Sequence, residues 1–165
     1  MKKVMFAFVI ALPLIYFVAC NKANSPGYTS CVGVPVTADS AALLKFAADS
    51  IHVTRDTSGV YYQIIDSGTG TKPAPTAYLK VSYTGMLMDR SVFDTATNAA
   101  LQVRLYQLIP GWQYGLPKIG KGGRIKLLIP SLLAYGCQGA KNGDVVVIPP
   151  NSPVYFDITL VDLQN

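Results

Sequence analysis

Short β-rich segments, separated by turn residues, fill the chain from residue 58 onward, and this pattern constrains the fold more than any other feature. The first such segment is Val60–Ile65, and the last is Val154–Leu160, in which polar and apolar residues alternate. Strict alternation is typical of a strand that buries one face. The chain also holds 14 Gly and 11 Pro, which favour turns between strands. The other predicted strands cover residues 78–88, 92–93, 101–105 and 124–129.

Two helical segments accompany these strands. Gly111–Leu116 is long enough for only one or two helical turns. In Ala38–Ile51, apolar residues recur at helical spacing, and Thr37 or Asp39 can cap the first turn. We expect this helix to pack against the core rather than to bind a partner. Several strands around one short helix predict an antiparallel α+β domain with a preceding N-terminal helix.

The first twenty residues are expected to direct export. Lys2 and Lys3 precede the uncharged run Val4–Ala19, as in the charged and apolar regions of a secretory signal. An uncleaved membrane anchor is the alternative, although the run contains Pro13 and a span needs about 17–25 apolar residues. Both interpretations leave the domain exported and tethered to a membrane.

The residues Phe17-Val18-Ala19-Cys20 resemble the lipobox of bacterial lipoproteins. This resemblance implies that Cys20 is acylated and becomes the mature N-terminus. The protein would then be anchored by lipid in the cell envelope, facing the periplasm or the cell exterior. The predicted divisions are a signal peptide at 1–19, the acylated Cys and a flexible tether at 20–36, the helix and its connection at 37–57, and the main domain at 58–165.

The charge of the chain does not indicate a nucleic-acid partner. Fourteen Lys and Arg against nine acidic residues give +5, which falls to +3 without Lys2 and Lys3, and no basic run follows residue 20. With Cys20 assigned to lipid, Cys31 and Cys137 could form a disulfide in an exported protein, or remain two separate thiols. The single histidine has no ligand partners nearby, so we expect no metal and no cofactor.

The candidate functional residues are aromatic, and no set of polar catalytic residues typical of a hydrolase is found. No Ser/His/Asp set can be assembled around the single histidine, and the glycines at 120–123 lack the spacing of a phosphate-binding loop. One interpretation is that the aromatic residues simply fill the core. They are Tyr83, Phe93, Trp112, Tyr135 and Phe156.

Six short motifs favour a function for these residues. The series resembles the FKBP-type peptidyl-prolyl isomerases, the family that binds the macrolide tacrolimus, and the resemblance covers about residues 58–165. It implies an antiparallel half-barrel of five to six strands, wrapped around a short helix with an apolar pocket between them. In chain order the motifs are Tyr83-Thr84-Gly85-Met86-Leu87, Phe93-Asp94, Gly111-Trp112, Ala134-Tyr135-Gly136, Ile148-Pro149-Pro150-Asn151 and Phe156-Asp157-Ile158.

The resemblance also implies a role for each matching residue. Trp112 would form the pocket floor under a proline ring. The N–H of Ile109 and the hydroxyl of Tyr135 would each hold a substrate carbonyl. Asp94 would lie at the rim and accept a hydrogen bond from Tyr83. The remaining lining residues would be Phe93, Leu101, Leu108 and Phe156, with Val147 and Ile148 in a loop that overhangs the pocket.

Three features depart from the family pattern. Leu101 stands where an aromatic wall residue is common, which predicts a wider pocket. Pro110 replaces a basic or polar residue, but Ile109 keeps its own N–H. The loop from Cys137 to Val146 is longer than in minimal members, which puts substrate choice in question more than activity.

The resemblance implies a monomeric isomerase that acts on proline-containing, unfolded, exported polypeptides and binds macrolide inhibitors. Dimerising members of the family usually carry a longer helical arm than residues 38–51 provide. A second hypothesis is a non-catalytic proline-peptide binding module, or an envelope chaperone, that uses the same pocket. A purely structural envelope protein is a third hypothesis, supported only by the lipid anchor.

Overall fold

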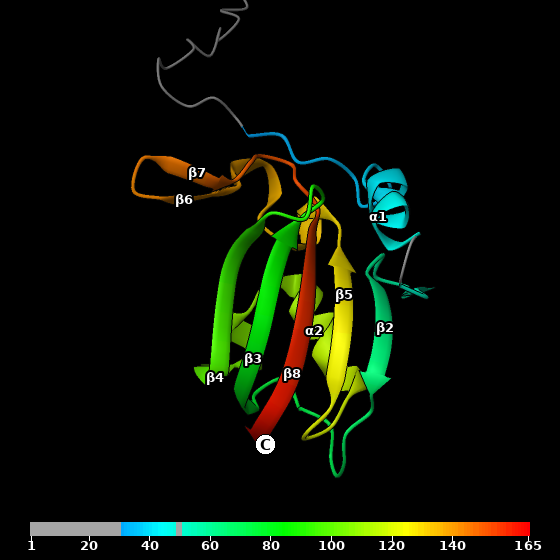
Figure 1. Ribbon diagram of the computed structural model, residues 1–165, viewed down its shortest axis with the longest axis vertical. Helices are drawn as coiled ribbons and strands as arrows, with labels where there is room; N and C mark the ends of the chain where they lie inside the picture. Colours follow the sequence, from blue (N-terminus) through cyan, green and yellow to red (C-terminus); the bar gives the residue numbers. More distant parts are fainter. Residues whose placement is uncertain (1–30, 49–50) are drawn as a thin grey trace, which may run out of the picture. The chain divides into compact units, whose positions relative to one another are not determined.

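The computed structural model describes residues 31–48 and 51–165 (Figure 1). The predicted signal peptide, Cys20 and the first part of the tether therefore lie outside the described residues. Residues Cys31–Asn165 form one compact unit. In this described part of the chain, no helix has both the length and the apolar character needed to cross a membrane.

Six strands form one open antiparallel sheet, as the sequence predicts. In chain order they are β1 (Thr54–Arg55), β2 (Tyr61–Asp66), β3 (Tyr78–Leu87), β4 (Val92–Arg104), β5 (Arg124–Ile129) and β8 (Val154–Gln164). Across the sheet the order is β1-β2-β5-β8-β3-β4, so β8 lies between β5 and β3 (Figure 1). Its long pairing with both neighbours makes β8 the central strand.

Strand β4 is longer than the sequence suggests. The segments expected at 92–93 and 101–105 belong to this one strand, which ends at Arg104. Polar residues between the two segments hide the continuity, yet Thr84 pairs with Thr95 and Tyr83 with Ala96. A register shift between Val81 and Tyr83 accommodates the change in alternation.

The expected loop at 137–146 contains a hairpin, which corrects the prediction. After a 3-10 turn, η4 (Gly136–Gln138), β6 (Ala140–Asn142) pairs with β7 (Val145–Ile148) as a separate two-stranded sheet. The hairpin projects from the main sheet at the upper left of Figure 1. Gly143 occupies its turn with φ of +58°, a conformation that glycine adopts without steric cost. Strands of three and four residues are too short to give a clear alternating pattern.

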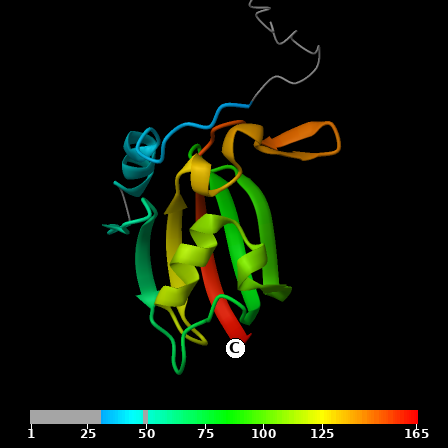
Figure 2. The ribbon, with the colours of Figure 1, turned by 180° about the vertical axis from the view of Figure 1, so that it is seen from behind.

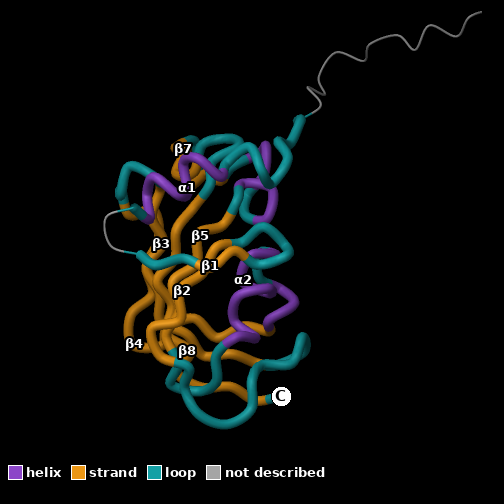
Figure 3. The backbone as a smooth tube through the Cα atoms, turned by 90° about the vertical axis from the view of Figure 1, so that its right-hand side faces the viewer, coloured by secondary structure: helices purple, strands orange, loops and turns teal. Residues whose placement is uncertain are grey.

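The short helix α2 (Pro110–Gly115) covers one face of the sheet (Figures 2 and 3). The 3-10 turns η1 (Leu105–Gln107) and η2 (Leu116–Lys118) flank it. Pro110 suits the first helical position, because the N–H that proline lacks has no partner within the helix there. The main core lies between α2 and the sheet; its fully buried side chains include Leu79, Val81, Leu116, Ile125, Leu127, Ile129, Ile158 and Leu160.

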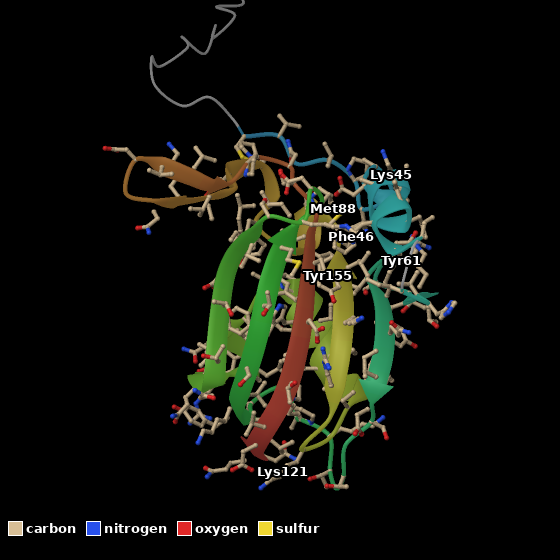
Figure 4. All side chains as sticks on the ribbon, in the orientation of Figure 1. Lys45, Phe46, Tyr61, Met88, Lys121 and Tyr155 are labelled. Atoms are coloured by element: carbon tan, nitrogen blue, oxygen red, sulfur yellow. A yellow bond between two sulfur atoms is a disulfide. The ribbon has the colours of Figure 1, made fainter. Side chains whose placement is uncertain are left out.

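The N-terminal helix α1 (Ser40–Ala47) is shorter than the predicted 38–51 and packs on the core, as expected. Asp39 precedes it, but its side chain makes no capping hydrogen bond to α1. Phe46 packs against Tyr155, with 5.0 Å between ring centroids (Figure 4). Tyr155 alternates with the residues that face α2, so this second core lies on the opposite face of the sheet. It consists of Leu43, Phe46, Ala47, Tyr61, Leu128 and Tyr155.

An ion pair joins the turn before β2 to η2. It should make the free energy of unfolding depend on pH in the acid range. The Nζ of Lys118 lies 2.7 Å from Oδ2 of Asp56, and the two side chains are 23% and 19% exposed. The hydrogen bond from Lys118 lowers the pKa of Asp56 from 3.8 to about 2. Because the folded pKa lies below the unfolded one, the stabilisation is present above about pH 4 and is lost as the pH falls through about 2.

We expect Asp56→Asn to reduce the free energy of unfolding by about 1–2 kcal/mol at pH 7, since one pKa unit corresponds to about 1.4 kcal/mol. The difference from the original chain should vanish near pH 2. Urea unfolding at several pH values measures both effects. Asp144→Asn, which removes the same charge at an exposed position, is the control. A difference that persisted unchanged at pH 2 would contradict the assignment.

Candidate functional site

A cavity of about 160 Å³ lies between α2 and the sheet. It contains one acidic side chain, Asp94, at its exposed edge. Most of its lining residues are apolar or aromatic, so the cavity suits an apolar group. The lining residues are Tyr83, Asp94, Leu101, Gln107, Leu108, Ile109, Trp112, Tyr135 and Phe156.

Tyr83 and Asp94 meet across the paired strands β3 and β4. The hydroxyl of Tyr83 donates a hydrogen bond to Oδ2 of Asp94 at 2.6 Å. Burial, and then this hydrogen bond, raises the pKa of Tyr83 above its ordinary value. Tyr83 therefore stays protonated near neutral pH, and the bond fixes the direction of its ring. Burial and the nearby charge of Asp94 also raise the pKa of Tyr135.

Aromatic rings at the base of the cavity pack edge to face. Trp112 lies 5.2 Å from Tyr83 and 5.0 Å from Phe156 between centroids, with interplanar angles of 83° and 86°. Phe93 also packs edge to face against Phe156, with 5.5 Å between ring centroids. A side chain at Gly85 would lie 2.7 Å from both Phe93 and Phe156, so the rings need glycine at this place on β3. Such packing holds the rings in one arrangement.

The first turn of α2 brings Trp112 to the cavity floor. The ring is 2% exposed, and its Nε1 has no hydrogen-bond partner among the described residues. Ile109 precedes the helix, so its N–H is not used in an intrahelical bond. Gln113 reaches back and donates from Nε2 to the carbonyl of Leu108 at 2.7 Å. The helix thus holds the wall residues Leu108 and Ile109 in place.

Most of the predicted site residues line the cavity, and three of them do not. Phe93 does not line the cavity but supports it, with its ring 6.1 Å from that of Tyr135. Val147 and Ile148 belong to β7 rather than to an irregular overhanging loop, and neither lines the cavity. Ile148 is only 2% exposed, because it packs into the main core.

Gln107 lines the cavity, although none of the sequence motifs includes it. This residue ends η1 and lines the cavity, and its Oε1 accepts a hydrogen bond from the N–H of Arg104 at 3.2 Å. Its position directly before Leu108 and Ile109 was the available signal. Leu101 lines the wall as expected.

Cys31 and Cys137 are joined by a disulfide, with their Cα atoms 5.5 Å apart. This spacing lies in the ordinary range for the bond. The sequence left open a disulfide or two separate thiols, and the structure contains the disulfide. In the described ranges, no three His, Cys, Asp or Glu side chains gather into a group that could hold a metal ion.

A known protein family matches the part of the chain that forms the cavity. A sequence model of the family described as FKBP-type peptidyl-prolyl cis-trans isomerase matches residues 69–161, more than half of the chain. The chain therefore belongs to the FKBP-type peptidyl-prolyl cis-trans isomerase family, as the six motifs predict.

Similar proteins with known names include peptidyl-prolyl cis-trans isomerases from two bacteria. FKBP-type peptidyl-prolyl cis-trans isomerase FkpA of Escherichia coli is 40% identical over 122 residues, which are 73% of this chain and 43% of FkpA. The FkpA crystal structure matches with a TM-score of 0.68 and 38% identity, over 78% of this chain and 58% of that one. A peptidyl-prolyl cis-trans isomerase from Pseudomonas syringae pv. tomato matches with a TM-score of 0.65 and 32% identity, over 81% and 99% of the two chains.

A further relative has a different name. The outer membrane protein MIP of Legionella longbeachae is 36% identical over 110 residues, which are 66% of this chain and 46% of MIP. The chain thus spans less than half the length of both FkpA and MIP.

Proposed function

We propose that this chain catalyses cis–trans isomerisation of Xaa-Pro bonds in unfolded, exported polypeptides. The observation that carries the proposal is the aromatic cavity floored by Trp112, with the Tyr83–Asp94 hydrogen bond at its rim. The cavity lies within the region that matches the family. The substrate class is any accessible proline-containing segment, because an apolar wall selects a proline ring and not a charged group.

The chemistry needs no proton transfer. Resonance gives the peptide bond a rotation barrier of about 18–20 kcal/mol, and uncatalysed prolyl isomerisation takes about 10–100 s. The twisted transition state loses double-bond character, so its carbonyl is less polar than that of the planar amide. Apolar walls destabilise the planar form more than the twisted one, which lowers the barrier.

The proposal assigns a role to each polar group at the rim. The N–H of Ile109 and the hydroxyl of Tyr135 donate hydrogen bonds to substrate carbonyls on either side of the proline. Asp94 acts on the substrate through Tyr83, whose ring it orients. Leu101 in place of an aromatic wall leaves room for different residues before the proline. Macrolide inhibitors, by family resemblance, would occupy the same cavity.

The test is an isomerisation assay on Xaa-Pro peptides, with the purified chain kept in mild detergent. We expect Asp94→Ala to lower kcat/KM by about tenfold, because a charge-assisted hydrogen bond of about 1.5–3 kcal/mol that orients Tyr83 is lost. Asp162→Ala, which breaks an exposed ion pair with Lys121, should leave kcat/KM unchanged. No acceleration by the unmodified chain would overturn the proposed function, and equal rates in both variants would overturn the role of Asp94.

A chaperone function is the second candidate, and the hairpin β6–β7 favours it. Val145 and Val146 are 66% and 50% exposed, close in sequence to the cavity residue Tyr135. Exposed apolar side chains of this kind can hold unfolded segments. Suppression of aggregation of a proline-free client, without any isomerase activity, would favour the chaperone over the enzyme.

We also propose that the protein is exported, lipid-anchored through Cys20 in the cell envelope, and monomeric. Support for the anchor comes from the charged and apolar N-terminal run and from the resemblance of residues 17–20 to a lipobox. The name of the relative MIP, an outer membrane protein, is consistent with an envelope location. Mass spectrometry of the mature N-terminus tests the anchor: an unmodified Cys20 would contradict it.

A further inference from the structure

Residues 31–39, which we call the strap, lie outside the region that matches the family and cross the end of the sheet (blue in Figure 1). In Figure 1 they run from the base of the hairpin β6–β7 to α1. On the way they contact one particular segment, residues 131–138, which we call the Tyr135 loop. This loop contains η3 (Ser131–Leu133) and η4, and it carries Tyr135 into the cavity.

The strap holds the beginning of the Tyr135 loop through Asp39. Oδ2 of Asp39 accepts hydrogen bonds from both the backbone N–H and the hydroxyl of Ser131, each at 2.7 Å. Asp39 is 8% exposed and Ser131 is fully buried. Two donors would lose their partner in a buried place if the carboxylate were removed, and such a loss is strongly unfavourable. Asp39 therefore fixes the place where η3 starts.

The strap holds the other end of the same loop through the disulfide between Cys31 and Cys137. Between the two attachments, the strap and the Tyr135 loop remain close to each other. A Cβ atom at Gly33 would lie 3.2 Å from Cδ1 of Leu132. Asn151 adds a link, since its Nδ2 donates to the carbonyl of Val32 at 3.3 Å and its N–H to the carbonyl of Gly136 at 2.8 Å.

These two attachments stand four residues before and two residues after Tyr135. We infer that the strap positions the Tyr135 loop, with Asp39 and the Cys31–Cys137 disulfide as positioning residues for substrate binding. Neither group touches the cavity, so both act through the placement of Tyr135. The inference rests on the proposed isomerase function. It adds that residues before the matched region set the affinity for the proline-containing segment.

The test compares kcat and KM of the full chain with those of Asp39→Ala and of the double variant Cys31→Ser/Cys137→Ser. Because Tyr135 binds substrate in both the ground and the transition state, KM should rise about threefold to tenfold while kcat changes less than twofold. Asp39→Asn keeps an acceptor oxygen and should restore most of the affinity. Asp56→Asn, which breaks a tertiary link elsewhere, should leave KM unchanged.

A second measurement separates positioning from general loss of stability. In a Tyr135→Ala background, neither Asp39→Ala nor the cysteine variants should raise KM further, because they act through the missing ring. Additive effects in that background, or an unchanged KM in the single variants, would overturn the inference. If Asp39→Ala does not fold, the cysteine variants decide the question.

The failure of the proposed function would be visible separately, as an inactive unmodified chain. Amide hydrogen exchange in residues 131–138 still tests the strap in that case. The Cys31→Ser/Cys137→Ser variant should exchange at least tenfold faster there than the unmodified chain, and equal protection in the two would overturn the inference.

Discussion

Replacing Trp112 with Ala should lower kcat/KM for an Xaa-Pro peptide by about a hundredfold. In the proposed function, the indole forms the floor on which the proline ring rests. Burying one apolar side chain contributes about 1.5–3 kcal/mol, and each 1.4 kcal/mol is a factor of ten in rate. The substitution also removes ring contacts with Tyr83 and Phe156. A stability loss of about 3–5 kcal/mol should accompany the loss of activity.

A matched control separates these two effects. Tyr155 is buried almost as deeply as Trp112, at 6% exposure against 2%, but it packs against Phe46 on the opposite face of the sheet. Tyr155→Ala should therefore destabilise the fold and leave kcat/KM of the folded molecules nearly unchanged. Rates are measured at low temperature and divided by the folded fraction from circular dichroism. Equal losses of corrected activity in the two variants would contradict a specific role of Trp112 in the cavity.

Replacing Gly111 with Val should destabilise the domain by about 3 kcal/mol. A Cβ at this position would overlap the side chain of Ile129, with Cδ1 at 2.7 Å and Cγ1 at 2.9 Å. Ile129 is fully buried, so its side chain has no free space into which it could move. In an exposed helix, replacing glycine is usually favourable, because glycine costs about 0.5–1 kcal/mol there. Overpacking outweighs this gain, since it typically costs about 1–3 kcal/mol and more for a branched side chain.

Tyr114→Val is the control for Gly111→Val, because it places the same residue in the same helix at a position that is 48% exposed. Urea unfolding should show less than about 0.5 kcal/mol of change for this variant. Adding Ile129→Ala to Gly111→Val should recover part of the lost stability, although Ile129→Ala alone is destabilising. Purely additive effects would contradict the close approach of α2 to β5.

The sequence predicted the strands where alternation was strong. The segments 124–129 and 154–160 correspond to β5 and β8, because each buries one face against α2. The cavity residues Tyr83, Asp94 and Trp112 were predicted from short motifs, since each keeps its order and spacing along the chain. The structure brings these three residues to one cavity.

The rest depends on contacts that no local pattern contains. Asp39 was one of two residues expected to cap α1, yet its carboxylate accepts hydrogen bonds from Ser131, which is 92 residues away. The polar residues between 94 and 98 hid the middle of β4, because its pairing with β3 does not require apolar side chains. Ile148 was placed over the pocket by its motif, whereas the pairing of β7 turns it into the core.

The central place of β8 in the sheet affects when the domain can fold during synthesis. Every other strand of the sheet is synthesised before β8, yet β5 and β3 have no direct pairing and meet only through it. Until β8 leaves the ribosome, the two halves of the sheet cannot join and Phe156 is missing from the aromatic cluster. We therefore expect the complete sheet and the complete aromatic cluster to form together, once β8 is available to pair with both neighbours.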